Sequence, residues 1–213
     1  MRQPAAAGTT AIVPVKHLDW AKSRLAGQLS PAERAGLVLV LLEHVLGAVR
    51  RAPSVDRCLV VSPDPRVRDR AAMLGAAVLD EPAAGGGQNA ALEHARSFAR
   101  RWRPAALLVV AADLPRLTPA DLEAVIGLGA GPGTVVLAPD RRETGTNLLY
   151  LTPPDCLPFC FGPGSFRAYR GEAERRGLRV HVYRAPGTAS DLDTPADLAA
   201  LGGIAAIAPA LIG

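Results

Sequence analysis

Three segments of this 213-residue chain carry the same signature for the start of an α-helix. At residues 30–33, 118–121 and 194–197, a serine or threonine precedes a proline, and an acid follows two residues after the proline. The hydroxyl can cap the first free N–H groups, the proline suits the first helical position, and the acid favours the positive end of the helix. Residues 88–103 and 165–176 also have the pattern of helices.

Short apolar runs alternate with these helices along the chain. Several are apolar throughout, as in strands that are covered on both faces. The pattern predicts an α/β fold, with a single domain whose mostly parallel sheet has helices on both faces. We place this domain at residues 10–203, between an N-terminal arm at 1–9 and an apolar C-terminal tail at 204–213. The predicted strands are residues 10–15, 57–62, 77–79, 106–111, 134–138, 146–151 and 178–183.

Charge and composition favour a small anionic ligand over nucleic acid. The net charge is +4, and the cations are spread along the chain without interleaved aromatic side chains, unlike in proteins that bind single strands. No apolar stretch is long enough to cross a membrane. Three cysteines and no signal peptide suggest the reducing cytoplasm. The apolar tail suggests docking on the domain or on a second subunit, as in a homodimer.

Lysine is confined to one short segment. Of the 24 basic residues, only Lys16 and Lys22 are lysines, and all the others are arginines. Lysine offers phosphate oxygens a compact, mobile ammonium group, which the planar guanidinium of arginine replaces poorly. Both lysines follow an apolar run, so we expect them in the loop after the first strand, where phosphates bind in α/β proteins. Codon bias with chance is the alternative explanation.

Three aspartates have the spacing of a metal site. Asp113 follows the apolar run 106–112, so it would lie where a buried strand ends and face the ligand crevice. Asp191 and Asp193 would share one side of an extended segment, because side chains alternate there. Neighbouring carboxylates repel unless a cation lies between them, and Mg²⁺ accepts carboxylate and phosphate oxygens. Capping of a turn by Asp113, or of the next helix by one of the pair, is the alternative.

Glycine-rich turns supply the other candidate binding groups. Residues 85–87 are glycines that lead into Gln88 and Asn89, whose amides could contact a nucleobase or ribose. Helix capping would also explain Asn89. Residues 144–147, ending in Asn147, and residues 161–165 could each hold a carboxylate or phosphate on backbone N–H groups and hydroxyls. Both turns follow, in the chain, the segments that could bind a nucleotide, so they suggest a second, acidic substrate.

In this order, the segments resemble the 2-phospholactate guanylyltransferase family, which acts in the biosynthesis of the redox deazaflavin coenzyme. The resemblance covers roughly residues 10 to 203. It implies a nucleotide-diphospho-sugar-transferase-like, Rossmann-like fold and the transfer of GMP from GTP to a small phosphorylated carboxylic acid, with release of pyrophosphate. The matching segments are residues 14–16, 21–25, 88–92, 112–115, 145–147, 161–166 and 191–197.

The resemblance also implies roles for individual residues. Asp113, Asp191 and Asp193 would hold one or two Mg²⁺ ions. The residues implied in nucleotide binding are Pro14, Val15, Lys16, Lys22, Arg24, Gln88 and Asn89. Those implied in catalysis are Lys16, Lys22, Arg24 and Asp113. Those implied in binding the acid are Thr146, Asn147, Gly162 and Ser165.

Several points stay open at the level of sequence. The acceptor could be 2-phospho-L-lactate, phosphoenolpyruvate or 3-phosphoglycerate. Tyr169 stands where relatives are expected to have histidine, and substrate choice or pH dependence would differ if that position touched the acid. A molybdopterin or sugar-1-phosphate nucleotidyltransferase is the nearest alternative, but those enzymes usually have a Gly-Gly-rich loop where this chain has Pro14-Val15-Lys16. A non-catalytic nucleotide-binding domain is a further alternative.

Overall fold

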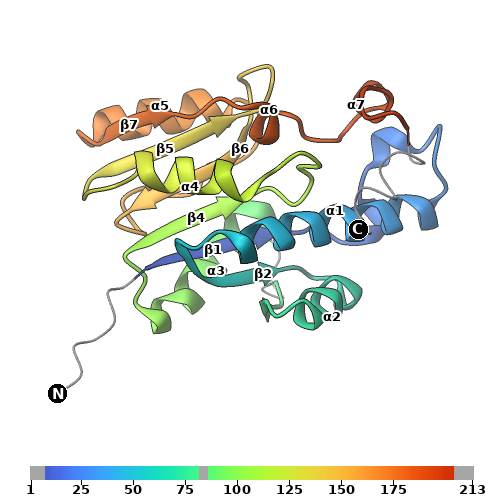
Figure 1. The fold of residues 1–213 in the computed structure, drawn as a ribbon, viewed down its shortest axis with the longest axis horizontal. Coiled ribbons are helices and arrows are strands. Elements are labelled where there is room, and N and C mark those ends of the chain that lie inside the picture. Colours follow the sequence, from blue (N-terminus) through green and yellow to red (C-terminus); the bar gives the residue numbers. More distant parts are fainter. Residues whose placement is uncertain (1–7, 82–85, 204–213) are drawn as a thin grey trace.

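The computed structural model describes residues 8–81 and 86–203. They form a seven-stranded sheet with helices on both faces (Figure 1), and the predicted α/β fold class is confirmed. The strands are β1 (Thr9–Pro14), β2 (Val55–Val61), β3 (Ala77–Leu79), β4 (Ala106–Val110), β5 (Thr134–Pro139), β6 (Thr146–Thr152) and β7 (Arg179–Val182). The α-helices are α1 (Pro31–Arg51), α2 (Pro65–Met73), α3 (Gly87–Ala99), α4 (Pro119–Leu128), α5 (Ser165–Arg175), α6 (Pro186–Ala189) and α7 (Pro195–Ala200). The 3₁₀ turns are η1 (Leu18–Trp20), η2 (Ser23–Leu25) and η3 (Arg100–Trp102).

The three helix starts with the shared signature form as predicted. At α1, α4 and α7 the hydroxyl accepts a bond from the backbone N–H of the acid three residues later, and that acid bonds back to the capping residue. Helix α2 was not predicted, although Asp64 caps it and Pro65 opens it in a similar way. Only Val67 and Ala71 of this helix are buried. Its charged residues therefore conceal the apolar periodicity that identifies a helix.

The strand order places a switch point next to the centre of the sheet. The order is β3-β2-β1-β4-β6-β5-β7, so β1 lies between β2 and β4 and is parallel to both. The chain runs outward from β1 to β3 and then returns to the other side of β1 with β4. In such sheets a crevice opens beyond the carboxyl ends of the two strands where the direction reverses. Here those ends lead into the lysine segment and Asp113.

One strand runs against the others and brings a second segment to this edge. β6 is antiparallel to both β4 and β5, and Val110 at the end of β4 pairs with Leu148 near the start of β6. The first residues of β6 therefore lie beside the carboxyl end of β4. The N–H of Ala111 donates to the carbonyl of Asn147 at 2.9 Å. The predicted acid-binding residues at 146–147 thus reach the same edge as Asp113.

The interior consists of two main cores and one small one. Alternate residues of the strands face α1, α2 and α4 on one side of the sheet and α3 and α5 on the other, as the period of two requires. A third group, here called the satellite cluster, is separate from both. It joins the loop after β1, the start of α1 and the chain around α7, which lie together at the right end of Figure 1. Its members are Leu25, Leu29, Leu37, Leu41, Leu192 and Leu198.

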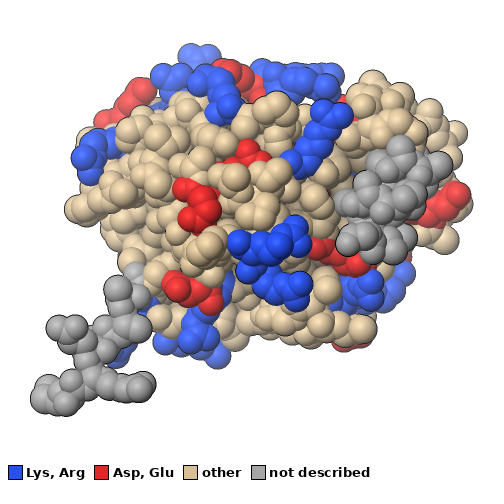
Figure 2. Space-filling model, viewed as in Figure 1, with Lys and Arg blue, Asp and Glu red and all other residues tan. Residues whose placement is uncertain are grey.

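The described surface has mixed charge. On the face drawn in Figure 2, basic groups are interspersed with acidic ones, and the described part of that face carries no continuous basic stripe. Within residues 8–81 and 86–203, no helix has both the length and the apolar character needed to span a bilayer. The predicted C-terminal tail and residues 1–7 of the predicted arm lie outside the described residues, and Thr9 already belongs to β1.

Candidate active site

Lys22 lies between two of the aspartates that the sequence assigned to a metal. Its Nζ is 2.5 Å from Oδ2 of Asp113 and 2.8 Å from Oδ1 of Asp193. The Lys22 side chain is only 6% exposed. Residues far apart in the sequence, from the loop after β1, the end of β4 and the segment before α7, therefore meet in one charged cluster.

The backbone of Lys22 is as unusual as its burial. The residue has φ +51° and ψ +37°, in the left-handed region that non-glycine residues seldom occupy. It opens η2, whose Leu25 is buried in the satellite cluster. Burial lowers the pKa of Lys22, but Asp113 and Asp193 outweigh this effect and raise the pKa above its usual value. Lys22 is therefore an ammonium group at neutral pH.

The three aspartates are held on two adjoining segments. Asp113 follows β4, and its carbonyl accepts a bond from the N–H of Leu192 at 3.1 Å. Leu192 is fully buried in the satellite cluster, between Asp191 and Asp193. Burial, then the charge of Asp113, raise the pKa of Asp191, while a bond from Nδ2 of Asn147 at 3.3 Å opposes the increase. The cluster therefore favours a cation near Asp191.

The donor set of this cluster suits a hard divalent cation. Three carboxylates supply oxygen ligands of the kind that Mg²⁺ prefers, without sulfur or imidazole. The carboxylates are spread more widely than a compact metal site, because among the described residues only His17, Asp19 and Asp64 bring three candidate ligand atoms within 4.8 Å of one another. At the active site the ammonium of Lys22 lies between Asp113 and Asp193. A cation bound there would share these carboxylates with Lys22.

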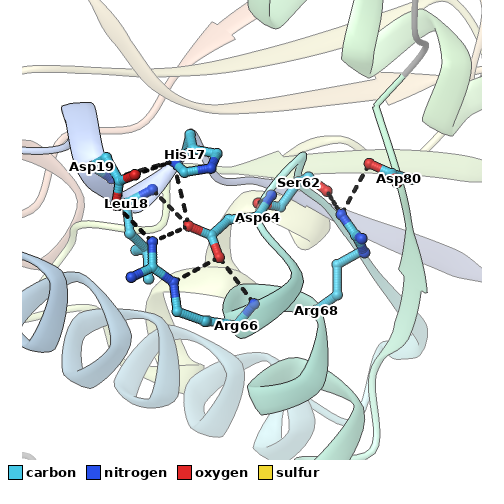
Figure 3. A network of polar contacts seen from close by, with 8 residues as sticks. All are labelled: His17, Leu18, Asp19, Ser62, Asp64, Arg66, Arg68 and Asp80. Atoms are coloured by element: carbon cyan, nitrogen blue, oxygen red, sulfur yellow. Dashed lines mark hydrogen bonds and ion pairs between the residues drawn. The ribbon is translucent and has the colours of Figure 1, made fainter.

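The second group, around Asp64, is a structural brace (Figure 3). Asp64 is fully buried and accepts bonds from Arg66, at 3.0 Å from Nε and 2.7 Å from Nη2, and from the N–H of Leu18 at 3.0 Å. Arg66 also donates to Asp19 at 2.8 Å. The guanidinium already pairs with both acids of this group, so the group ties the lysine loop to the start of α2.

The brace has a pH-dependent effect on stability that can be measured. Hydrogen bonds from Arg66 hold the pKa of Asp64 well below its usual range. Because the folded-state pKa is lowered, the contribution is complete above the unfolded pKa of about 3.9 and is lost as pH falls toward the folded value. We expect Asp64→Asn to lower the free energy of unfolding by about 1–2 kcal/mol at neutral pH, as measured by urea denaturation.

The same measurement at about pH 3 provides the internal check, because at that pH Asp64 is largely protonated in the unfolded chain but still ionised in the folded protein, so the difference between the two proteins should be smaller than at neutral pH. Asp69→Asn, at an exposed position that forms no ion pair with the described residues, is the control. An equal difference in unfolding free energy at both pH values would attribute the effect to packing and not to the charge of Asp64.

The other predicted nucleotide-binding residues line the same edge more openly. Val15 is buried, and its N–H donates to the carbonyl of Val61 at 2.9 Å, which fixes the start of the loop after Pro14. Lys16 is exposed and forms no ion pair with residues 8–81 or 86–203. Arg24 is largely exposed, with Nη1 3.9 Å from Oδ2 of Asp193. These cations remain accessible to an anionic ligand.

The glycine-rich loop before α3 gives Gln88 and Asn89 different surroundings. Gln88 is half-buried, and its side chain forms no hydrogen bond with the described residues. Asn89 uses its amide on the backbone of Phe161, at 3.0 Å from Nδ2 to the carbonyl and 2.8 Å from the N–H to Oδ1. Gly86 is the N-cap of α3, so Asn89 does not cap its own helix. Gly85 lies outside the described residues.

The predicted acid-binding residues also come together. Ser165 and Thr146 are buried, with their hydroxyl oxygens 3.2 Å apart. Gly162 and Gly164 have φ +134° and +75°, conformations that a turn of this shape reserves for glycine. Asn147 donates to the carbonyl of Thr188 at 2.9 Å and points toward Asp191. The predicted acid-binding residues and the aspartates predicted to hold a metal are therefore connected through Asn147.

Tyr169 belongs to the core beneath this turn. The residue is fully buried, and its hydroxyl accepts a bond from the N–H of Cys160 at 3.0 Å. Its ring packs edge-on against Phe161, with centroids 5.3 Å apart. Burial raises the pKa of Tyr169, so the phenol stays neutral. At this position Tyr169 supports the residues that lead into the turn, Cys160 and Phe161, and does not face the crevice.

Two contacts of the site have no clear signal in the sequence. The bonds between Asn89 and Phe161 join residues 72 positions apart. The bond from Leu18 to Asp64 joins residues 46 apart. The Asp64-Pro65 dipeptide is a helix-start signal that could have identified α2. The residue types alone do not indicate that Asp64 binds the backbone of Leu18, or that Asn89 binds the backbone of Phe161.

Solved structures share the fold at low sequence identity. A putative nucleotide-diphospho-sugar transferase from Desulfovibrio desulfuricans is 16% identical with a TM-score of 0.74, over 91% of this chain and 85% of that one. Glucosyl-3-phosphoglycerate synthase from Mycobacterium tuberculosis, in a complex with Mn²⁺, UDP and glucosyl-3-phosphoglycerate, is 16% identical with a TM-score of 0.65, over 98% of this chain and 80% of that one. The predicted nucleotide-diphospho-sugar-transferase-like fold is therefore confirmed.

Sequence relatives are closer and share one name. A phosphoenolpyruvate guanylyltransferase from Rubrobacter xylanophilus is 50% identical over 90% of this chain and 92% of the relative. Another from Sphaerobacter thermophilus is 46% identical over 93% of this chain and 95% of the relative. The sequence model of the CofC-like guanylyl transferases matches residues 9–202. The chain therefore belongs to the CofC-like guanylyl transferase family and is a nucleotidyltransferase.

Proposed function

We propose that the protein transfers GMP from GTP to phosphoenolpyruvate and releases pyrophosphate. Among the three acceptors that the sequence left open, phosphoenolpyruvate is favoured by the names of relatives up to 50% identical over nearly their whole length. The geometric observation that carries the proposal is the cluster of Lys22 with Asp113, Asp191 and Asp193 at the switch point of the sheet. There a polyphosphate can meet an ammonium group and acids able to hold a metal.

The two substrates are assigned to opposite sides of this cluster. The triphosphate would lie along Lys16, Lys22 and Arg24, with the base and ribose toward the loop that opens α3. The phosphorylated acid would bind at the turn before α5, where Thr146 and Ser165 lie together. Asp113 follows β4 and Thr146 opens β6, and these two strands are neighbours in the sheet, so the acceptor phosphate can approach the α-phosphorus.

We assign Mg²⁺ to Asp113, Asp191 and Asp193. The raised pKa of Asp191 and the oxygen-only donor set fit such an ion, and the Mn²⁺ in the glucosyl-3-phosphoglycerate synthase complex is consistent with a divalent metal in this fold. When bound, the ion would polarise phosphate oxygens and offset the charge of the leaving pyrophosphate. The remaining work falls to the protein side chains.

Those side chains position and neutralise the substrates. GTP brings about four negative charges and the acceptor about three more, so unscreened repulsion would keep them apart. Lys22 is a fixed ammonium group, whereas Lys16 and Arg24 can close on phosphate oxygens from solvent. The acceptor phosphate is already ionised at neutral pH, so the reaction needs no side-chain base. We also expect a role in deazaflavin coenzyme biosynthesis, a homodimer and no nucleic-acid partner.

Pyrophosphate release tests the proposal directly. The protein is incubated with GTP and Mg²⁺ and, in separate reactions, with phosphoenolpyruvate, 2-phospho-L-lactate and 3-phosphoglycerate. We expect release with phosphoenolpyruvate, loss of release in EDTA and recovery with added Mg²⁺. ATP in place of GTP is the control for the nucleotide. Release only with another of the acids would reassign the acceptor, and silence with all three from folded, GTP-binding protein would refute the proposed reaction.

A further inference from the structure

The side-chain amide of Asn89 binds both polar groups of one distant peptide residue. Nδ2 donates to the carbonyl of Phe161 at 3.0 Å, and Oδ1 accepts from the N–H of Phe161 at 2.8 Å. Two antiparallel hydrogen bonds to one residue fix its position and its orientation, as a paired strand would. Asn89 lies in the first turn of α3, so this contact anchors the Phe161 backbone to a helix.

The anchored residue begins the turn assigned to the acid. Phe161 is followed by Gly162 and Gly164, both with positive φ, and no helix or strand spans residues 153–164. These two glycines allow the turn more backbone conformations than other residues would. Its entry is held by side chains: Asn89 fixes Phe161, and the hydroxyl of Tyr169 accepts from the N–H of Cys160 at 3.0 Å. The exit is fixed where Ser165 opens α5.

The position of Asn89 in the chain makes this anchor a link between the two substrate sites. Gln88, its neighbour on the same turn, has no hydrogen-bonding partner among the described residues and is free to meet the nucleotide. Asn89 has one amide proton and one carbonyl oxygen committed to Phe161. The helix that follows the nucleotide-side loop therefore holds the acid-side turn.

We propose that Asn89 is a positioning residue for the acid substrate, acting through the backbone of Phe161 and not on the guanine base. This inference rests on the proposed function, and it changes the role that the family resemblance implied for Asn89. Without the clasp, the turn from Gly162 to Gly164 would sample more conformations, and its N–H groups would have to be ordered again each time the acid binds.

Steady-state kinetics of Asn89→Ala distinguish the two roles. We expect the KM for phosphoenolpyruvate to rise by at least about tenfold, since two hydrogen bonds are lost. We expect the KM for GTP, and the preference for GTP over ATP, to change by less than about twofold. Ser97→Ala, at an exposed position later on α3 that forms no side-chain hydrogen bond with the described residues, is the control, and its acid KM should stay at the wild-type value. A raised KM for GTP alone, or a lost preference for GTP, in Asn89→Ala would overturn the proposal.

Amide hydrogen exchange gives a second readout that needs no turnover. We expect the backbone N–H groups of residues 160–162 and of Gly164 to exchange faster in Asn89→Ala than in the wild type or in Ser97→Ala, while those of β1 and β4 stay protected. Unchanged exchange in this turn would show that Asn89 does not hold it. If the wild type releases no pyrophosphate with any of the three acids, the proposed function fails, and the exchange experiment still decides whether the clasp exists.

Discussion

Replacing Asp113 with asparagine is expected to lower kcat for pyrophosphate release by about 10³-fold while the protein stays folded. Asparagine preserves the size of the side chain, and the Asp113 carbonyl that binds the N–H of Leu192 is unaffected. The change removes one charge that pairs with Lys22 and one proposed ligand of Mg²⁺. The measurement combines initial rates at saturating Mg²⁺ with the midpoint of thermal unfolding.

The control for this variant is Asp69→Asn, which removes the same charge from an exposed position on α2. Its kcat should equal that of the wild type. Near-wild-type activity in Asp113→Asn would remove Asp113 from the metal site. A large drop in the unfolding midpoint would instead make the loss of activity a consequence of lost structure.

Replacing Lys22 is expected to have the second large effect. In Lys22→Met, two carboxylates lose their partner, and the proposed triphosphate loses a fixed ammonium group, so we expect kcat to fall by about 10²- to 10³-fold. Lys22→Arg should not restore activity. The Lys22 side chain is only 6% exposed, and the larger, planar guanidinium does not fit the space between Asp113 and Asp193. Initial rates of pyrophosphate release measure both variants.

A metal titration separates the two roles of Lys22. Without nucleotide, Lys22→Met should bind Mn²⁺ more tightly than the wild type, because the ammonium no longer shares Asp113 and Asp193. Paramagnetic resonance of free Mn²⁺ measures this affinity. Lys16→Met is the comparison, since its exposed side chain has no such pairing with the described residues. Full activity in Lys22→Arg would show that the position requires only a positive charge.

Most of the fold follows from local signals in the sequence. Several of the strands are apolar runs, and the capping boxes at α1, α4 and α7 depend on residues three apart. Such signals do not depend on the rest of the chain. Helix α2 was not predicted, because Val67 and Ala71 are its only buried residues and give too weak an apolar periodicity. Its start resembles the other three: the carboxylate of Asp64 accepts a bond from a backbone N–H of the first turn, as the hydroxyls do elsewhere, and Pro65 takes the first helical position.

The sequence indicates which residues belong to the site, but not which of them contact one another. Asp113, Asp191 and Asp193 stand out in the sequence because strand ends and alternation place acids at an edge. The sequence could not distinguish Lys22, with its left-handed backbone and two carboxylate partners, from the exposed Lys16. That difference arises only when β1 and β4 become neighbours. The clasp of Asn89 on Phe161 depends in the same way on long-range folding.

The satellite cluster has a consequence for how the enzyme responds to heat. Leu25 anchors the turn that Lys22 opens, and Leu192 lies between two of the acids, yet both belong to the small cluster and not to the cores that cover the sheet. A few leucines provide far less cohesion than those larger interiors. On warming, the charged cluster would separate while the sheet is still intact. We therefore expect this small cluster to set the upper working temperature of the enzyme, and better packing there to extend that temperature without altering the rest of the molecule.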